Sequence, residues 1–342
     1  MRWLLSSMLS KPVTWLLHIA LTTILVGACV THFFGEQGEI HLRADKAETI
    51  HVKQHALTLF LWSFEVTEAD YIAELRILDR SRAPLVVDEG TARINKPLKY
   101  HGFRFCLSDY DSDEMGVVLA YNYDPWGIGI TYTGYALLLI SMVGFFFQKH
   151  SLFRTLLNQS VFGQRSGLFS VCAVVIIMVL TFVMTKAVTP KPPLQPVLQT
   201  PLLGIHVSVI MLAYTLFAVM MVNGILGLCV TKWRKKLMLL SQVLLYPAEF
   251  CLIVGIFVGA VWANMSWGRY WGWDPKETWA LVTMLVYALL LHFPWMKKLL
   301  AKSDQHQKSE KIYHILSIVA FLFVLFTYFG VSYLLGGLHS YS

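Results

Sequence analysis

Charged residues are scarce in this sequence of 342 residues. Asp, Glu, Lys and Arg together make up 14% of it, against roughly 25% in soluble globular domains. This shortage excludes an ordinary soluble domain. The 56% of hydrophobic residues and the mean hydropathy of +0.55 exclude an intrinsically disordered chain. Aromatic residues, by contrast, reach 14% and include 11 Trp. The composition therefore predicts a membrane protein.

Cysteine motifs are also missing. The five cysteines are scattered and form no Cys-x-x-Cys pair, which excludes the usual spacing of a zinc site and a thioredoxin-like redox motif. Four of them lie in apolar runs, where we expect small buried residues: Cys29, Cys172, Cys229 and Cys251. Cys106 lies alone in the polar part of the chain, so we expect no disulfide framework.

Seven apolar runs are long enough to cross a bilayer, because a transmembrane helix needs about 20 apolar residues. They cover residues 13–34, 128–147, 167–185, 204–230, 237–263, 279–296 and 313–335. The first run is too long for the core of a cleavable signal peptide. These runs predict an all-α polytopic membrane protein with about seven transmembrane helices.

A polar segment, residues 36–126, separates the first two runs. Its stretches 56–66, 71–77 and 117–123 alternate in part between apolar and polar residues, which is typical of half-buried strands. We therefore expect one small β-rich extracytoplasmic domain between the first two helices, built as an open sheet or a sandwich.

The net charge of +7 is explained by the loops between the runs. Fourteen Lys and Arg lie on the side of the N-terminus, in residues 1–12, 148–166, 231–236 and 297–312. Only four lie in the short loops on the other side, in residues 186–203, 264–278 and 336–342. By the positive-inside rule, the N-terminus is cytoplasmic, and the 264–278 loop and the C-terminus are extracytoplasmic. The basic residues thus indicate topology, and no nucleic-acid partner is expected.

The extracytoplasmic loop is unusually aromatic. Residues 267–279 contain four Trp and one Tyr, which is either an interfacial aromatic belt or a surface for a large flat apolar ligand. Two glycines allow close backbone approach, and Arg269 and Lys276 are available for anionic groups. Asp274, before Pro275, and Thr278 are also candidates for capping the next helix.

Four of the 12 histidines form two pairs at different depths. His18 and His292 lie inside predicted spans, in the cytoplasmic half, and His206 and His339 lie at the outer surface. Each alone could be a helix-packing residue, whereas intramembrane ionisable residues indicate function by default. Because neutral imidazole is a good iron ligand, the pairs would suit two bis-histidine haem sites. His314 is a weaker candidate: it lies in the first turn of the last span, where we expect it to snorkel.

The aromatic loop carries a family resemblance. Its sequence WGRYWGWDPKETWAL, residues 267–281, resembles the WWD signature of the System II cytochrome c synthases, the CcsA/ResC family. Residues 205–208 and 337–341 resemble the external histidine segments of that family, so the resemblance covers about residues 165–342. We therefore assign residues 149–342 to a CcsA/ResC-like haem-handling part with five transmembrane helices and the external WWD loop 264–278.

The first part of the chain resembles the partner subunit, CcsB/ResB. The matching pieces are residues 31–35, 100–105, 124–127 and 131–135. We assign residues 1–148 to this part, with transmembrane helices at 13–34 and 128–147 around the β-rich domain 36–126. The external domain and the number of spans are smaller than is usual for the partner subunit, so the chain resembles a compact fusion of both subunits.

The resemblance implies a holocytochrome c synthase in the cytoplasmic (inner) membrane. Haem b would be held in the membrane by His292 and His18, and then at the external site by His206 and His339, which the resemblance marks as catalytic. The implied cofactor-binding residues of the loop are Trp267, Arg269, Tyr270, Trp271, Trp273, Asp274 and Trp279. The implied partners are apocytochrome c with a Cys-x-x-Cys-His motif, thiol-reducing thioredoxin-like proteins, further biogenesis subunits and membrane lipid.

Two other functions fit the same residues. A b-type cytochrome that exchanges electrons with quinone would also carry bis-histidine pairs at two depths, and a haem exporter would move haem without forming a bond. The b-type cytochrome does not require a long external tryptophan loop.

Overall fold

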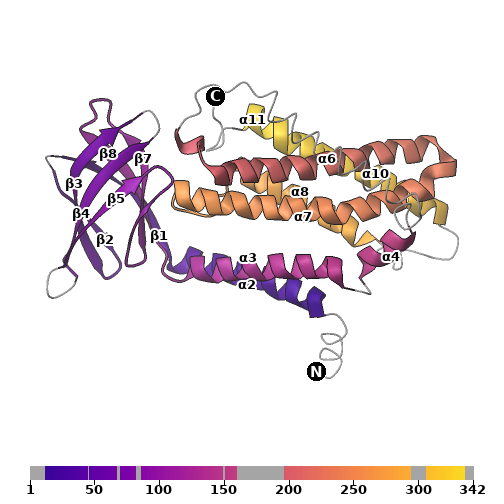
Figure 1. Cartoon of the computed structure of the whole chain (residues 1–342), viewed down its shortest axis with the longest axis horizontal. Coiled ribbons are helices and arrows are strands. Elements are labelled where there is room, and N and C mark those ends of the chain that lie inside the picture. The colour runs from indigo at the N-terminus through magenta and orange to yellow at the C-terminus, as the bar shows by residue number, and fades with distance from the viewer. Residues whose placement is uncertain are drawn as a thin grey trace. The chain divides into compact units, whose positions relative to one another are not determined.

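The computed structural model describes residues 12–44, 46–67, 70–81, 86–148, 151–159, 196–293 and 306–335 (Figure 1). The chain divides into two compact units. The first unit comprises Met1–Ile140, Lys191–Leu203 and Gly259–Trp271, and the second comprises Ser141–Pro190, Gly204–Val258 and Gly272–Ser342. The boundary between the units therefore passes through the aromatic loop, between Trp271 and Gly272.

Two apolar helices flank the β domain in the sequence of the first unit. They are α2 (Pro12–Phe34) and α3 (Gly127–Phe147), of which the first unit includes the residues up to Ile140. The two helices approach closely through small residues: a Cβ added to Gly134 would lie 2.6 Å from Cγ1 of Ile24, and one added to Gly27 would collide with Thr131. Such small-residue contacts are typical of helices that pack within membranes.

Eight strands between these helices form two four-stranded antiparallel sheets. One sheet has the order β1 (Glu36–Arg43), β8 (Gly116–Tyr123), β7 (Phe103–Tyr110), β6 (Leu98–Tyr100). The other has the order β2 (Glu48–Val52), β3 (His55–Val66), β4 (Tyr71–Asp79), β5 (Val86–Arg93). The three strands predicted from alternation correspond to β3, β4 and β8, and the sandwich arrangement is confirmed.

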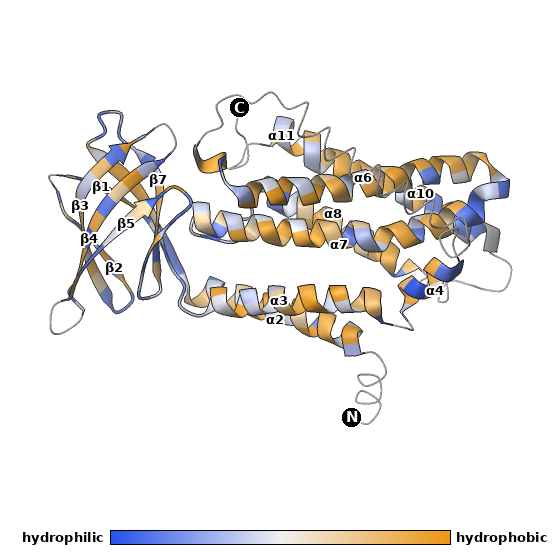
Figure 2. Cartoon of the chain, in the orientation of Figure 1, coloured by the Kyte–Doolittle hydropathy of each residue, from blue (hydrophilic) through white to orange (hydrophobic). Residues whose placement is uncertain are grey.

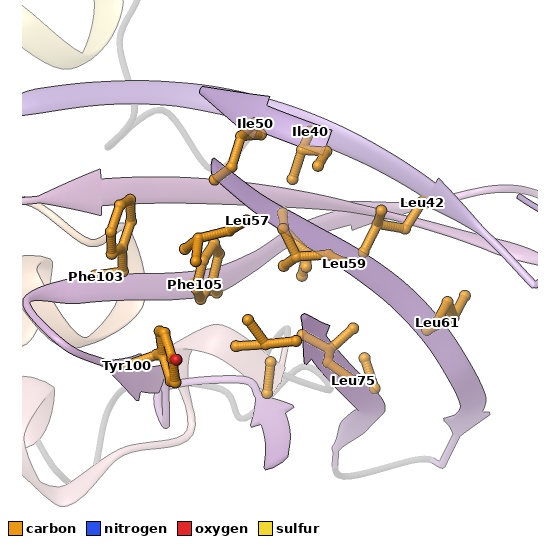
Figure 3. Close-up of a cluster of buried hydrophobic side chains, with 14 of the residues drawn as sticks. Ile40, Leu42, Ile50, Leu57, Leu59, Leu61, Leu75, Tyr100, Phe103 and Phe105 are labelled. Atoms are coloured by element: carbon orange, nitrogen blue, oxygen red, sulfur yellow. The ribbon is translucent and has the colours of Figure 1, made fainter. Parts of the chain in front are cut away.

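The core of the sandwich consists of aliphatic and aromatic side chains from both sheets (Figure 3). In β3, Leu57, Leu59 and Leu61 are buried at every second position, as the pleat of a strand requires. Phe103 and Phe105 of β7 are buried in the same core, with their rings stacked 5.9 Å apart. The core therefore fixes the register of β7, the strand that carries Cys106.

The second unit is helical. Its elements are α4 (Leu152–Gln159), α6 (Pro201–Cys229), α7 (Arg234–Ser266), α8 (Pro275–Leu291), α10 (His306–Leu325) and α11 (Val331–Leu334), with the single turns η3 (Thr231–Trp233) and η4 (Phe326–Gly330). The turn η2 (Pro196–Leu198) belongs to the first unit. The first residues of α6 and the last of α7 belong to the first unit. Figure 2 shows that hydrophobic residues predominate along α6 and α7.

Five helical segments in the described part of the chain are long and apolar enough to cross a membrane. They are Pro12–Phe34, Gly127–Gln159, Pro201–Cys229, Thr231–Ser266 and Lys308–Leu334. The sixth predicted span, 279–296, corresponds to α8, which is shorter, with 17 residues. The predicted span 167–185 lies outside the described residues. The chain is thus a multi-pass membrane protein.

The burial predicted for the membrane cysteines is wrong for Cys29 and Cys229. Both side chains are exposed on their helices, and Cys251 is half-buried. The reason is that a helix face in contact with lipid is as apolar as a face in a protein core. Hydropathy therefore does not distinguish an exposed cysteine from a buried one on a membrane helix. Cys172 lies outside the described residues. Cys106 is free and buried, in agreement with the absence of a disulfide framework.

Candidate functional site

The aromatic loop begins where α7 ends, in the first unit. The N–H of Trp267 donates to the carbonyl of Ala263 over 2.7 Å, and its ring lies edge-on to Trp262 with the centroids 4.8 Å apart. The next residue, Gly268, has a φ of +73°, a left-handed conformation that glycine adopts without steric cost. The chain therefore turns sharply out of the helix at Gly268.

The loop is fastened to the β sandwich at this turn. The side-chain amide of Asn122, in β8, donates to the carbonyl of Gly268 over 2.6 Å. A Cβ at Gly268 would lie 3.1 Å from Sγ of Cys106, in β7. Ser266 also donates to Oδ1 of Asn95, which lies just after β5. Glycine at 268 thus permits both the turn and the close approach to the sheet.

Tyr270 connects the loop to both helices of the first unit. Its hydroxyl donates to Oγ1 of Thr31 over 2.9 Å and accepts a longer contact of 3.4 Å from Thr131. Thr31 in turn donates to Oδ2 of Asp124 over 2.6 Å. The other oxygen of Asp124 accepts the backbone N–H of Gly127 at the start of α3, over 2.7 Å. We call Asp124, Thr31, Tyr270 and Thr131 the loop anchor.

The ring of Tyr270 is buried as well. It packs against Ile128 and Ala260, and partly buried Trp271, Tyr132 and Tyr135 pack against the same cluster. The hydroxyl of Tyr132 accepts a hydrogen bond of 2.6 Å from Asn264. Tyr270, predicted to bind a cofactor, therefore has a packing role in the first unit, whereas Trp271 keeps part of its surface accessible.

The loop continues in the second unit with a strained residue. Trp273 has a φ of +55°, which is uncommon for a bulky side chain, and 71% of its surface is exposed. A capping box follows. The Asp274 side chain accepts the N–H of Lys276 over 2.9 Å, and Oε2 of Glu277 accepts the N–H of Asp274 over 3.3 Å, which completes the box. The same Glu277 oxygen also accepts the N–H of Gly272 over 2.8 Å. The cap predicted at Asp274 is confirmed, and it fixes the backbone on both sides of Trp273.

Trp279 lies in the first turns of α8. Its half-buried ring lies 4.3 Å from that of Phe326 between centroids, and its carbonyl accepts a hydrogen bond of 3.2 Å from Thr327. The ring is therefore held by the last helical segment of the second unit. Arg269 belongs to the first unit and is half-exposed.

His206, near the start of α6, is oriented by another helix. Its Nδ1 lies 2.7 Å from the carbonyl oxygen of Gly255, in α7. A carbonyl only accepts, so Nδ1 carries the proton, and Nε2 holds the lone pair of the neutral ring. Metal-binding histidines usually have this arrangement, in which the second nitrogen donates to a carbonyl or carboxylate. A side chain at Gly255 would meet Ile210 at 2.6 Å, so glycine allows the two helices to approach.

His18 and His292 are oriented within their own helices. Both side chains are exposed, and their Nδ1 atoms lie 2.7 Å and 2.8 Å from the carbonyl oxygens of Thr14 and Ala288. Each ring therefore also leaves its lone pair on Nε2. His339 lies outside the described residues. No cluster of three or more His, Cys, Asp or Glu that could hold a metal ion occurs among the described residues. The pairing of His18 with His292 and of His206 with His339 stays a prediction.

The expectation for His314 is wrong. Its ring does not snorkel but is fully buried, and its Nε2 lies 3.0 Å from the carbonyl oxygen of Arg234. Gly227 makes room for this ring, because a Cβ there would meet His314 Nε2. The hydropathy pattern is the same for a buried and a snorkelling histidine, so it could not distinguish them.

The loop anchor is not predictable from the sequence. Asp124 before Gly127 is a local capping signal, but the contacts of Thr31 and Thr131 with Tyr270 join residues more than a hundred positions apart and have no local signature. Cys106 was left without a role. Burial raises the pKa of its thiol to about 12, so the thiol is protonated near neutral pH and is a poor nucleophile.

The described residues define a class: a polytopic membrane protein whose β sandwich holds the start of a tryptophan loop, with a histidine oriented by a backbone carbonyl. Comparison with known sequences gives the family. Residues 130–339 match the cytochrome c assembly protein family, and residues 8–129 match the ResB-like family. The chain belongs to the cytochrome c assembly protein family, with a ResB-like part fused to its N-terminal side, as the resemblance indicated.

Curated relatives agree with this assignment. The chain is 40% identical to protein NrfI of Wolinella succinogenes over 160 residues, which are 44% of this chain and 17% of NrfI. It is 36% identical to the cytochrome c biogenesis protein CcsA of Chlamydomonas reinhardtii over 55% of this chain and 53% of the relative. The chain is 35% identical to CcsA of Guillardia theta over 44% of this chain and 56% of the relative. The chain thus spans less than two thirds of the length of these relatives.

Proposed function

We propose that this chain is a holocytochrome c synthase that moves haem b across the cytoplasmic membrane and attaches it to apocytochrome c. The observation that carries the proposal is the geometry of His206 in a member of the cytochrome c assembly family. Its Nδ1 faces the Gly255 carbonyl at 2.7 Å, which leaves Nε2 as the iron-binding nitrogen. Haem is the substrate, and imidazole nitrogen is a ligand that its iron accepts.

The other proposed ligands follow the same logic. His339 completes the external site with His206, and His18 and His292 form the membrane site. The orientation of Nδ1 towards a carbonyl supports the iron-binding role of both membrane histidines. At the external site, the exposed ring of Trp273 covers the haem, and the positive charges of Arg269 and Lys276 attract its propionates.

The covalent step needs no thiol from this chain. Each client thiol of the Cys-x-x-Cys-His motif adds across one haem vinyl group: the sulfur bonds to one vinyl carbon and the thiol hydrogen goes to the other. Binding both reactants in one geometry is the contribution of the protein. The thiol of Cys106 is buried and protonated, which agrees with a reaction that uses only the client thiols.

The ResB-like part has a positioning role in this proposal. Its β sandwich and α2 hold Gly268 and Tyr270 through Asn122, Thr31 and Asp124. Thiol-reducing thioredoxin-like proteins and further biogenesis subunits are the other proposed partners. The proposed membrane is the inner one, with the N-terminus cytoplasmic and the loop and C-terminus outside, following the positive-inside rule.

Co-expression of the full chain with an apocytochrome c tests the proposal. We expect covalent haem on the Cys-x-x-Cys-His motif of the client, detected by haem staining after denaturing electrophoresis, and loss of that signal with His206→Gly. His51→Gly is the control, since His51 is an exposed histidine of β2. A quinone-reducing protein without covalent product, or export of haem without attachment, would refute the synthase. In the described part of the chain, no observation favours either alternative.

A further inference from the structure

Buried polar side chains form a row along one face of α7, in the second unit. Arg234 and Ser241 are seven residues apart, and so are Gln242 and Glu249, and all four are buried. A seven-residue spacing returns nearly to the same face of a helix. At 1.5 Å per residue, the row from Arg234 to Glu249 extends roughly 22 Å from the end of α7 opposite the aromatic loop.

The part of the row nearest the start of α7, at Arg234 and Ser241, is hydrogen-bonded. Asn223 of α6 donates to Ser241 over 3.2 Å, and Nε of Arg234 donates to the carbonyl of Gly227 over 2.9 Å. His314 of α10 contacts the carbonyl oxygen of Arg234. Three helices thus contribute polar groups to the interior of the helical unit. Such groups are rare in transmembrane segments and mark pathways for ions, protons or substrates.

The other end of the row, at Glu249, contains polar groups without hydrogen-bond partners in the described chain. Glu249 is 2% exposed, and within the described chain neither of its carboxyl oxygens has a hydrogen-bond partner. The hydroxyl of the fully buried Tyr287, in α8, also lacks one, and this tyrosine is close enough to Glu249 to interact with it electrostatically. Pro247, inside α7, cannot donate the helical hydrogen bond to the Val243 carbonyl, which adds another acceptor at this level.

Several unsatisfied polar groups at one depth need a further partner, because buried polar groups in native proteins are almost always hydrogen-bonded. Internal water is the usual partner when side chains cannot reach one another. Phenols are the neighbouring ionisable groups: Tyr214 of α6 and Tyr313 of α10 each lie close enough to Tyr287 to interact with it electrostatically, and Tyr246 of α7 lies close enough to Tyr313. With no cation among them, an unprotonated carboxylate would be an unpaired buried charge.

We propose that Glu249 is a protonated, proton-exchanging acid at the end of a hydrated polar row, and that protons reach it along Arg234, Ser241 and Gln242. The ligand of this site is water, held between Gln242, Glu249 and Tyr287. A carboxyl that exchanges its proton with water can offset a change of charge inside the bundle, which an apolar core cannot do. The site does not depend on haem, so its test is independent of the test of the synthase function.

Infrared spectroscopy of the purified full chain tests this site. Wild type should show a carboxylic-acid C=O band that Glu249→Gln removes and that shifts to lower frequency after transfer to D2O. Gln242→Leu, which interrupts the row, should keep the band and slow its shift. Glu89→Gln, which removes an exposed carboxylate of β5, should leave the band unchanged.

Three results would overturn the proposal. They are a spectrum in which Glu249→Gln removes no acid band, a band that does not shift in D2O, and a shift that Gln242→Leu does not slow. Size-exclusion chromatography and circular dichroism show whether each variant is folded. If Glu249→Gln is unstable, Glu249→Asp keeps the acid and should change the frequency of the same band.

Discussion

Replacement of Gly268 by alanine tests how the loop is held. A non-glycine residue in the left-handed region costs about 1 to 2 kcal/mol, and Gly268 has a φ of +73°. The new Cβ would also lie 3.1 Å from Sγ of Cys106, and overpacking of this kind costs about 1 to 3 kcal/mol. The local free energy of opening should therefore fall by about 2 to 5 kcal/mol.

Hydrogen–deuterium exchange of the segment from Trp262 to Trp271 measures this local opening. Since 1.4 kcal/mol corresponds to a factor of about ten, exchange should accelerate more than tenfold in Gly268→Ala. Adding Cys106→Ala removes the steric contact but not the backbone strain, so the double variant should recover part of the protection. Gly129→Ala is the matched control, because a Cβ there meets nothing within 4 Å. Native exchange in Gly268→Ala, or no recovery in the double variant, would refute the argument.

Three further predictions concern single residues of the site. Tyr270→Phe should lower the stability of the loop by about 1 to 3 kcal/mol, because Thr31 and the buried Thr131 lose their partner; exchange of the same segment measures it, and an unchanged rate would show that the loop anchor is not formed. Trp273→Ala should weaken haem retention without lowering the melting temperature, since its ring is exposed; a lower melting temperature would indicate a packing role instead. Cys106 should resist alkylation in the folded chain below pH 12, and rapid labelling at pH 8 would contradict its burial. Because burial raises the pKa of its thiol from 9.0 to about 12, the contribution of Cys106 to the free energy of unfolding should be lost as pH rises from about 9 towards 12.

The fold was predictable where the pattern is local. Alternation in 56–66 predicts β3 because burial of every second side chain is a property of one strand, and the run 204–230 predicts α6 because a bilayer requires a long apolar helix. Asp274 before Pro275 predicts the start of α8, since capping involves residues within one turn. The helix α7 begins at Arg234, three residues before the predicted span 237–263. The hydrophobic run excludes Arg234 because it is charged, but its side chain is buried and donates to the carbonyl of Gly227.

The site was predictable only in part, because its geometry depends on contacts between distant residues. The resemblance marked Tyr270 as a cofactor-binding residue, which stays a prediction. The sequence did not indicate that its hydroxyl and ring join the loop to α2 and α3. His206 lies near the start of α6, where its span was expected to begin. Its orientation by Gly255 depends on how closely α6 and α7 approach. Periodicity describes one element at a time, so it contains no information on such pairs.

We propose that His206 binds haem iron at the external site. The most direct test is the absorption spectrum of the purified chain with His206→Gly, recorded with and without added imidazole. We predict that the variant loses the spectrum of six-coordinate haem and that imidazole restores it, as the free ligand occupies the position of the missing ring. A wild-type spectrum in His206→Gly, or a loss that imidazole does not restore while His51→Gly stays normal, would contradict the account.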